Sequence, residues 1–283
     1  MSESARNAVT GFAGPHHADE PLLLPNAWDH ASAAALAAQG FRAVGTTGLA
    51  VAAGAGLPDG AATTREQTLL LALTLGSGPY RLSVDAEDGS SDDPDEVASS
   101  AGELYAVGAV GINLEDGLGP VGRHAAKIAA VRAAVPALFV DARTDTYWAA
   151  GPDADGGSRR EDTFRRLDAY QQAGAHGVFV PGLTGPREIA GPVRRFDVPL
   201  TVLYPPTGPS VPQPAGLGVR RISLGSLLYR RALGAAVEAA TDIREGRAPT
   251  GTAPAYAEIQ ALSRDSVRGT ADATASLGRP WYG

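Results

Sequence analysis

Cysteine is absent from the 283-residue chain. This excludes disulfides, zinc sites built from thiolates and catalysis by a thiol. Long apolar runs are absent as well, because no stretch approaches the roughly 20 residues needed to span a bilayer. No segment resembles a secretory signal peptide. We therefore expect a soluble, cytoplasmic protein that does not engage a membrane.

Positive charge is also scarce. The chain has 24 basic and 31 acidic residues, a formal charge of -7, and Lys127 is its single lysine. Nucleic acids and anionic membranes both require a basic face, so neither is expected as a partner. The length is sufficient for one large α/β domain with a sizeable core.

The chain contains eight short apolar runs that alternate with helical segments. Continuous apolar strands are typical of a parallel sheet with both faces buried. The strands are predicted at 22–24, 41–46, 81–84, 110–114, 137–142, 177–180, 199–203 and 219–224. Eight such units in this length fit a (β/α)8 barrel of the TIM type better than an open sheet. Neither a dinucleotide-binding fingerprint nor a P-loop is found.

The pattern divides the chain into three parts. Residues 1–19 lack periodicity and are interpreted as an N-terminal arm, and 20–245 as the barrel. Residues 246–283 form a C-terminal helical extension and tail. Within the barrel, the Gly- and Ala-rich segment up to Gly60 is expected to be a loop, and residues 63–75 a helix capped by Thr63 or Thr64.

An acidic segment follows the third strand. Asp85, Glu87 and Asp88 fall within four positions. If the strand continues, Asp85 and Glu87 point to the same side, because side chains alternate with a period of two. Two carboxylates aimed at one point repel each other unless a proton or a cation lies between them, and oxygen ligands favour Mg²⁺ or Mn²⁺. A hydrated acidic loop without a role is the alternative.

The barrel interpretation gives this acidic segment a context. Active sites of such barrels lie at the C-terminal ends of the strands. The polar residues at these ends are Thr46, Thr47, Asp85, Glu87, Glu115, Asp116 and Arg143. Acids and an arginine on three successive strand ends therefore favour a functional site over a hydrated loop without a role.

Eight motifs in this order resemble the isocitrate lyase / phosphoenolpyruvate mutase superfamily. They are Leu-Pro-Asn-Ala-Trp-Asp (24–29), Val-Gly-Thr-Thr (44–47), Gly-Leu-Pro-Asp-Gly (56–60), Ser-Val-Asp-Ala-Glu (83–87), Gly-Ile-Asn-Leu-Glu-Asp (111–116), Ala-Arg-Thr-Asp (142–145), Gly-Val-Phe-Val-Pro-Gly (177–182) and Ser-Leu-Gly-Ser (223–226). The resemblance covers about residues 20–235. It implies a barrel enzyme that uses Mg²⁺ on a small 2-oxo or 2-hydroxy carboxylate. It also implies a homo-oligomer, a tetramer or dimer, with C-terminal helices swapped between subunits.

The resemblance also implies roles for individual residues. Asp85 would bind the metal directly, while Asp59, Glu87 and Glu115 would hold metal-bound waters. Arg143 would bind the substrate carboxylate, and Asp145 could position Arg143. The remaining substrate-binding positions implied are Thr46, Thr47, Gly48 and Leu49. Asp59, Glu115 and Arg143 are the residues expected to act in catalysis.

The sequence departs from the superfamily where its reactions are selected. It lacks the cysteine loop of isocitrate and methylisocitrate lyases and the lysine- and asparagine-bearing lid of phosphoenolpyruvate mutase. Instead, Glu115-Asp116 is followed by the short, lysine-free segment 117–124. Arg123 and His124 in this segment either contact a second anionic group or face solvent at a helix start.

Three functions remain open from sequence. The preferred one is a carbon–carbon lyase that acts through an enolate, stabilised by a metal that withdraws electrons from the 2-oxo acid. The second is a phosphoenolpyruvate phosphonomutase or a phosphonopyruvate hydrolase-like enzyme that acts on a carbon–phosphorus bond. The third is a barrel that binds a carboxylate without catalysis.

Overall fold

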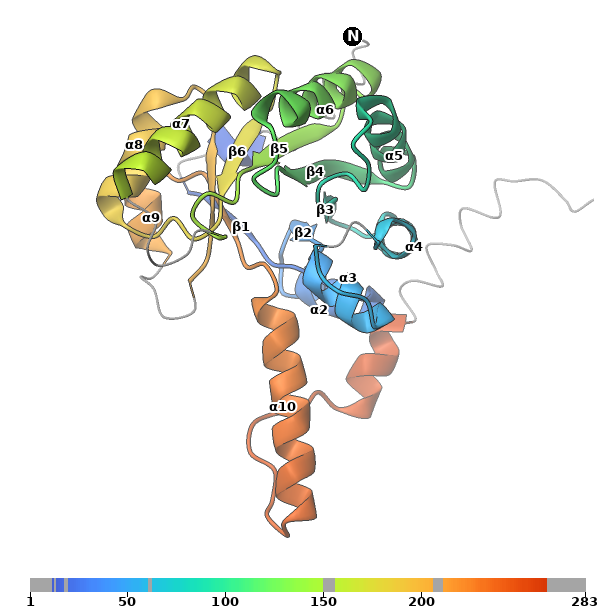
Figure 1. Cartoon of the computed structure of the whole chain (residues 1–283). Helices are drawn as coiled ribbons and strands as arrows, with labels where there is room; N and C mark the ends of the chain where they lie inside the picture. Colours follow the sequence, from blue (N-terminus) through green and yellow to red (C-terminus); the bar gives the residue numbers. More distant parts are fainter. Residues whose placement is uncertain are drawn as a thin grey trace, which may run out of the picture.

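Eight parallel strands form the centre of the structure, a computed structural model that describes residues 12, 14–17, 20–60, 63–149, 156–205 and 211–263 (Figure 1). The strands are β1 (Leu22–Leu24), β2 (Ala43–Gly45), β3 (Arg81–Asp85), β4 (Ala109–Glu115), β5 (Phe139–Arg143), β6 (Gly177–Val180), β7 (Leu200–Leu203) and β8 (Arg221–Ser223). They pair in the order β1-β8-β7-β6-β5-β4-β3-β2.

The two ends of this sheet meet between β1 and β2. Asn26 and Gly45 form a parallel bridge, and the Ala27 amide donates to Gly45 O at 2.8 Å. A Cβ on Gly45 would lie 2.8 Å from Asn26 Nδ2, so only glycine allows this approach. The sheet thus closes into a barrel, and the predicted (β/α)8 fold is confirmed.

Helices follow the strands around the outside of the barrel (Figure 1). They are α2 (His30–Ala38), α3 (Gly48–Ala55), α4 (Arg65–Leu75), α5 (Pro94–Ala106), α6 (Val121–Ala134), α7 (Gly156–Gln172), α8 (Pro186–Arg195), α9 (Pro212–Gly216) and α10 (Leu227–Arg244), with a 3-10 turn, η1 (Gly14–His17), before β1. Among the described residues, no helix is long and apolar enough to cross a membrane.

The segment between β2 and Gly60 differs from its prediction. It was expected to be a loop, but residues Gly48–Ala55 form α3. Its alanines favour the helix, and Gly56 ends it in the left-handed conformation with φ of 68°. The N-terminus of α3 therefore lies directly after β2, at Gly48.

The end of β3 also differs from the sequence argument. The strand ends at Asp85, and Glu87 has a φ of 49°. The alternation expected for a continuing strand therefore does not apply beyond Asp85. A non-glycine residue in the left-handed region is strained, and such residues concentrate at functional sites.

The barrel base and the C-terminal helices extend the fold. Phe12 is fully buried and packs edge-on against Phe139 at 5.4 Å, so this part of the predicted arm closes the barrel. In Figure 1, α10 extends away from the barrel, and the helix at 256–263 returns toward α2. The Leu262 carbonyl lies 3.5 Å from His30 Nε2. The predicted domain boundaries at 19 and 245 stay predictions.

The barrel interior contains a buried polar cluster. Arg221 on β8 is fully buried and lies 3.3 Å from Asp141 Oδ2. Arg221 also donates to Asn113 Oδ1 at 2.9 Å and to Ser83 Oγ at 3.2 Å, and Thr201 donates to Asp141 at 2.7 Å. A buried ion pair is tolerated when hydrogen bonds surround it. This cluster ties β3, β4, β5, β7 and β8 together in the barrel interior.

Candidate active site

A cavity of about 520 Å³ lies at the C-terminal ends of the strands. Residues after all eight strands contribute to its wall. The wall is formed by Asn26, Thr47, Gly48, Leu49, Asp59, Gly60, Asp85, Glu87, Asn113, Glu115, Gly117, Arg143, Asp145, Trp148, Phe179, Pro181, Leu203, Ser223, Gly225, Ser226 and Arg230. Of the residues to which the resemblance assigns a binding or catalytic role, only Thr46 is not among them. Asp116, which was grouped with them at the strand ends, lines a neighbouring cavity instead.

Thr46 is buried and supports Asp85 from below the cavity. Its Oγ1 accepts a hydrogen bond from the Asp85 amide at 2.9 Å, and its carbonyl accepts one from Asn26 Nδ2 at 2.5 Å. Thr46 therefore acts on the cavity through Asp85 and Asn26, and it does not line the wall as a substrate-binding residue would.

Asp85 is fixed by the start of α3. The Gly48 amide donates to Asp85 Oδ2 at 3.0 Å. The first amides of a helix have no partner within the helix, and the helix dipole favours negative charge at this end. The Gly48 amide, expected from sequence to bind substrate oxygens, therefore orients a carboxylate in this structure.

Glu87 and Asp59 approach the same glycine from the other side. A Cβ added to Gly48 would meet Glu87 Oε1 at 3.1 Å and Asp59 Oδ1 at 3.4 Å. Thr64, just before α4, donates to Glu87 Oε1 at 2.7 Å. Glu87 Oε2 is buried and has no hydrogen-bond partner among the described residues. An unpartnered buried carboxylate oxygen is costly, so it points to a missing ligand.

Arg143 at the end of β5 is held by two carboxylates. Its Nη1 lies 2.6 Å from Glu115 Oε2, and its Nε donates to Asp145 Oδ1 at 2.8 Å. The contact with Asp145 expected from sequence is present. Nε and Nη1 each point at a carboxylate, so among the described contacts both N–H groups of Nη2 are available for a ligand in the cavity.

The site carries an excess of negative charge. Burial raises the pKa of Glu115 to about 8; Arg143 opposes this rise, and Asp85, Asp145 and Glu87 add to it. Burial also raises the pKa of Asp59, with Asp85 adding to the effect. For Glu87, burial raises the pKa, Thr64 opposes the rise, and Asp85 and Asp59 add to it. These carboxylates destabilise one another, and a cation held between them would relieve the repulsion.

The donor set fits a hard divalent cation held largely through water. Asp59, Asp85, Glu87 and Glu115 offer only oxygen atoms, and Glu87 Oε2 is free to accept. Within the described ranges, no three His, Asp or Glu side chains are arranged to ligate a metal directly. Mg²⁺ keeps several of its waters, so one direct ligand with the others acting through water is compatible with this geometry. The predicted roles of the individual carboxylates stay predictions.

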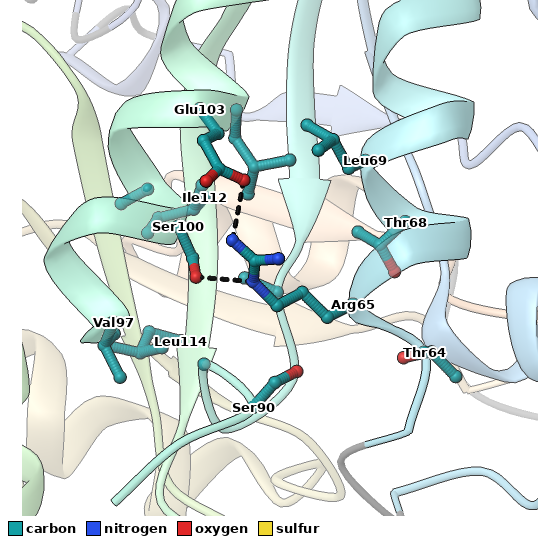
Figure 2. A pocket seen from close by; sticks show the side chains of 14 residues that line it. Thr64, Arg65, Thr68, Leu69, Ser90, Val97, Ser100, Glu103, Ile112 and Leu114 are labelled. Carbon is teal, nitrogen blue, oxygen red and sulfur yellow. Dashed lines mark hydrogen bonds and ion pairs between the residues drawn. The ribbon is translucent and has the colours of Figure 1, made fainter. Parts of the chain in front are cut away.

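A smaller, apolar pocket of about 30 Å³ lies between α4 and α5 (Figure 2). Figure 2 shows Arg65 at its side, where Nε donates to Ser100 Oγ at 2.8 Å and Nη2 to Glu103 Oε2 at 2.7 Å. Most of its wall is apolar, and it offers no converging acids or bases. Thr64 lines this pocket and also binds Glu87, so the packing of α4 supports the acidic site.

The segment after Glu115 borders a third cavity of about 290 Å³, which shares Glu87 and Glu115 with the main one. Arg123 there pairs with Asp92 at 2.6 Å. His124 is buried, which excludes the solvent-facing alternative for this residue; burial lowers its pKa to about 4. Neither side chain lines the main cavity.

Sequence reasoning missed part of the cavity wall. It did not assign Asn26, Asn113, Phe179, Leu203 and Arg230 to the site, although four of them lie within or just after strands. The available signal was position at a C-terminal strand end, which applies to apolar residues as well as to acids. Arg230 lies in the first turn of α10, and its Nε donates to Ser226 Oγ at 3.2 Å.

The fold agrees with comparisons to known proteins. Residues 12–244 match the family model described as phosphoenolpyruvate phosphomutase. An uncharacterized protein of Mycobacterium tuberculosis is 41% identical over 254 residues, which are 88% of this chain and 95% of that protein. The 2-methylisocitrate lyase of Bacillus subtilis is 29% identical over 213 residues, which are 70% of this chain and 68% of the lyase.

A solved phosphonopyruvate hydrolase, in complex with oxalate and Mg²⁺, has a TM-score of 0.78 and 23% identity. The match covers 94% of this chain and 98% of the hydrolase, and at this identity it shows the fold. The family model matches residues 12–244, which include all eight strands, and a match of this length shows the family as well as the fold. The chain therefore belongs to the phosphoenolpyruvate phosphomutase family, within the isocitrate lyase / phosphoenolpyruvate mutase superfamily.

Proposed function

We propose that this protein is a Mg²⁺-dependent enzyme that acts on a small 2-oxo or 2-hydroxy carboxylate through an enolate, as a carbon–carbon lyase. The observation that carries the proposal is the composition of one cavity wall. Asp59, Asp85, Glu87 and Glu115 line it together with Arg143. This gives an acidic half suited to a cation and a basic group suited to a carboxylate.

The acidic half would hold the cation. Asp85, oriented by Gly48, is the proposed direct ligand, and Asp59, Glu87 and Glu115 are proposed to bind its waters. Mn²⁺ suits the same oxygen donors. A bound Mg²⁺ ion would withdraw electrons from a chelated 2-oxo acid and so favour the enolate. The phosphonopyruvate hydrolase of the same fold, solved with oxalate and Mg²⁺, supports this assignment.

The basic half would bind the substrate carboxylate. Arg143 is fixed by Glu115 and Asp145 before a ligand arrives, so little side-chain entropy is lost on binding. Thr47 and Leu49, on either side of Gly48, are proposed to contact substrate oxygens at the start of α3. Phe179 and Leu203 supply an apolar wall that limits the entry of water.

The alternative with a specific observation in its favour is carbon–phosphorus chemistry. The matching family model is described as phosphoenolpyruvate phosphomutase. Against it stands the segment 117–124, which lacks the lysine and asparagine of the mutase lid. A barrel that binds a carboxylate without catalysis is the third candidate.

Enolate formation can be measured directly. With pyruvate and Mg²⁺ in D₂O, the proposed enzyme should exchange the C3 protons, and proton NMR records their loss. A parallel screen would include 2-hydroxy and 2-oxo diacids and phosphonopyruvate. Turnover of phosphonopyruvate alone would reject the lyase in favour of carbon–phosphorus chemistry. Bound oxalate without exchange or turnover would leave the non-catalytic barrel.

We also propose that copies of this chain associate through the C-terminal helices, as a dimer or tetramer. Along the described length of α10, only Asp242 is buried. Leu233, Val237 and Ile243 are each more than half exposed. Apolar side chains gathered on one extended helix indicate a surface that another chain covers. The swapping of this helix between subunits remains part of the same proposal.

A further inference from the structure

A buried arginine behind the active site connects three segments of the chain. Arg166 lies on α7 and is only 6% exposed. Its Nη1 donates to Asp116 Oδ2 and to Gly119 O, both at 2.9 Å, and its Nη2 donates to Leu118 O at 3.3 Å. Its Nε donates to Asp162 Oδ2 at 2.9 Å, one turn earlier on the same helix. The guanidinium thus bonds to the residue after Glu115 and to the turn that follows it.

Asp116 receives hydrogen bonds on both of its oxygens. Oδ2 accepts from Arg166 and, at 2.7 Å, from the Tyr170 hydroxyl. Oδ1 accepts from the Leu118 amide at 3.0 Å and from the Asp145 amide at 3.2 Å. A carboxylate with four donors has little freedom to move. Asp116 therefore fixes the backbone of Asp145 relative to α7.

Asp145 passes this constraint to the proposed carboxylate-binding residue. Its side chain accepts the hydrogen bond from Arg143 Nε, while the Asp116 amide donates to Arg143 O at 3.1 Å. A continuous path of hydrogen bonds therefore runs from Arg166 through Asp116 and Asp145 to Arg143. A second link exists between Thr163 on α7 and Thr146, whose hydroxyl oxygens are 2.7 Å apart.

The turn held by Arg166 is strained. Gly117 has a φ of 48° and Leu118 a φ of 58°. A leucine in this left-handed region is strained and requires support from its surroundings. Arg166 supplies that support by donating to two successive carbonyls of the turn, Leu118 O and Gly119 O. Gly117 lines the cavity beside Glu115, so the shape of this turn is part of the site.

We infer that Arg166 is a positioning residue, which holds Arg143 and the 117–119 turn in the geometry that binds the substrate carboxylate. The inference takes the identity of the ligand from the proposed function. The contacts of Arg166 are observed independently of that function. Lysine could not replace the guanidinium, because a single ammonium cannot reach Asp116, Leu118 O and Gly119 O in one plane.

The test compares variants on the same helix. Arg166→Met removes the guanidinium, Arg166→Lys keeps the charge, and Tyr170→Phe removes one donor to Asp116 with little change of shape. The matched control is Arg165→Met, because Arg165 pairs with the same Asp162 but has a side chain 61% exposed. The probe is oxalate with saturating Mg²⁺, measured by titration calorimetry well below the melting temperature.

Arg166→Met should weaken oxalate binding about 10-fold or more, as loss of a residue that orients a ligand-binding group commonly does. Arg166→Lys should fall between it and the wild type, and Arg165→Met should stay within about twofold of the wild type. A double variant with Asp145→Asn distinguishes positioning from general stability. If Arg166 acts through Asp145, the two changes together should cost less than the product of their separate effects.

Three results would overturn the inference. Unchanged oxalate affinity in folded Arg166→Met or Tyr170→Phe would leave Arg166 a structural residue only, and so would effects that multiply fully with Asp145→Asn. If the wild type itself does not bind oxalate with Mg²⁺, the proposed function fails, and hydrogen exchange then decides. The Leu118 and Asp145 amides should exchange faster in Arg166→Met than in Arg165→Met; equal exchange would refute the positioning role.

Discussion

Glu115 and Asp116 are neighbours in the chain but lie in opposite environments. Glu115 faces the cavity, where burial and three other carboxylates raise its pKa to about 8 despite the partner Arg143. Asp116 faces α7. Burial alone would raise its pKa, but donors including the Leu118 amide and the Tyr170 hydroxyl outweigh burial and lower it.

This difference indicates separate roles for the two sides of β4, a structural role for the side of Asp116 and a ligand-binding role for the side of Glu115. The Asp116 side is saturated with donors and has the hydrogen bonding of a finished core. The Glu115 side leaves Glu87 Oε2 without a partner and sets like charges against one another. A protein keeps such a costly arrangement where a ligand relieves it, so the unsatisfied side is the functional one.

The largest expected effect on stability is on the Asp116 side. Asp116→Ala should lower the free energy of unfolding by about 3–5 kcal/mol, because it removes the fully buried carboxylate partner of Arg166 and leaves only the partly exposed Asp162. Urea denaturation measures this change. A loss below about 1 kcal/mol would show that the hydrogen bonds of buried Asp116 do not stabilise the fold.

On the cavity side, Arg143→Lys should act on binding. An ammonium cannot donate to Glu115, Asp145 and a ligand carboxylate in the geometry of the guanidinium. We expect oxalate affinity in the presence of Mg²⁺ to fall about 10- to 100-fold, with little change in stability. Equal affinity in calorimetry would remove Arg143 from the role of carboxylate-binding residue.

Glu115→Gln should stabilise the metal-free protein, opposite in sign to Asp116→Ala. Glu115 has a raised pKa in the folded state, so its contribution to stability is present below about pH 4.5 and is lost as the pH rises through about 8. The gain in melting temperature from Glu115→Gln should therefore grow between pH 5 and pH 8, reaching about 2–4 °C.

Glu238→Gln, the same substitution at an exposed position outside the cavity wall, is the matched control, and the two variants are compared at each pH. His176 changes stability in the same pH range. Burial lowers its pKa to about 4, so its contribution is present above about pH 6.5 and is lost as the pH falls. His176 is common to both variants and cancels in the comparison. A loss of stability in Glu115→Gln would contradict the account of the cavity side.

The smallest effect on the barrel should come from the surface of α10. Leu233→Asp places a charge on the exposed apolar face without touching the cavity, so each barrel should keep its stability. The mass in solution, measured by light scattering, should fall from that of an oligomer to that of a smaller assembly. An unchanged mass would exclude this face as the interface.

The fold could be predicted because its signal is local. Eight apolar runs identified eight strands, and the runs fixed which ends carry Asp85, Glu115 and Arg143. The helix α3 was missed because its Ala- and Gly-rich sequence lacks an apolar–polar period. The conformation of Glu87 was missed because a left-handed φ at a glutamate has no sequence signal and is imposed by contacts such as the one with Thr64.

The charged residues of the cavity could be predicted from sequence, but the residues that hold them in place could not. Acids and an arginine at strand ends are recognisable by residue type and position, whereas Arg166 lies inside a helix with several charged neighbours. Only the tertiary structure brings it to Asp116, 50 positions earlier in the chain. Sequence patterns identify groups that meet a ligand more readily than groups that hold those residues in place.

The most direct test of the account is a titration of Mg²⁺ into the protein with oxalate present. Calorimetry should show saturable binding to the wild type, and Asp85→Ala should abolish it, because the Gly48 amide orients the Asp85 carboxylate and Thr46 holds the Asp85 backbone amide. Equal binding of Mg²⁺ and oxalate to both proteins would contradict the claim that the acids at the C-terminal ends of the strands form a metal site.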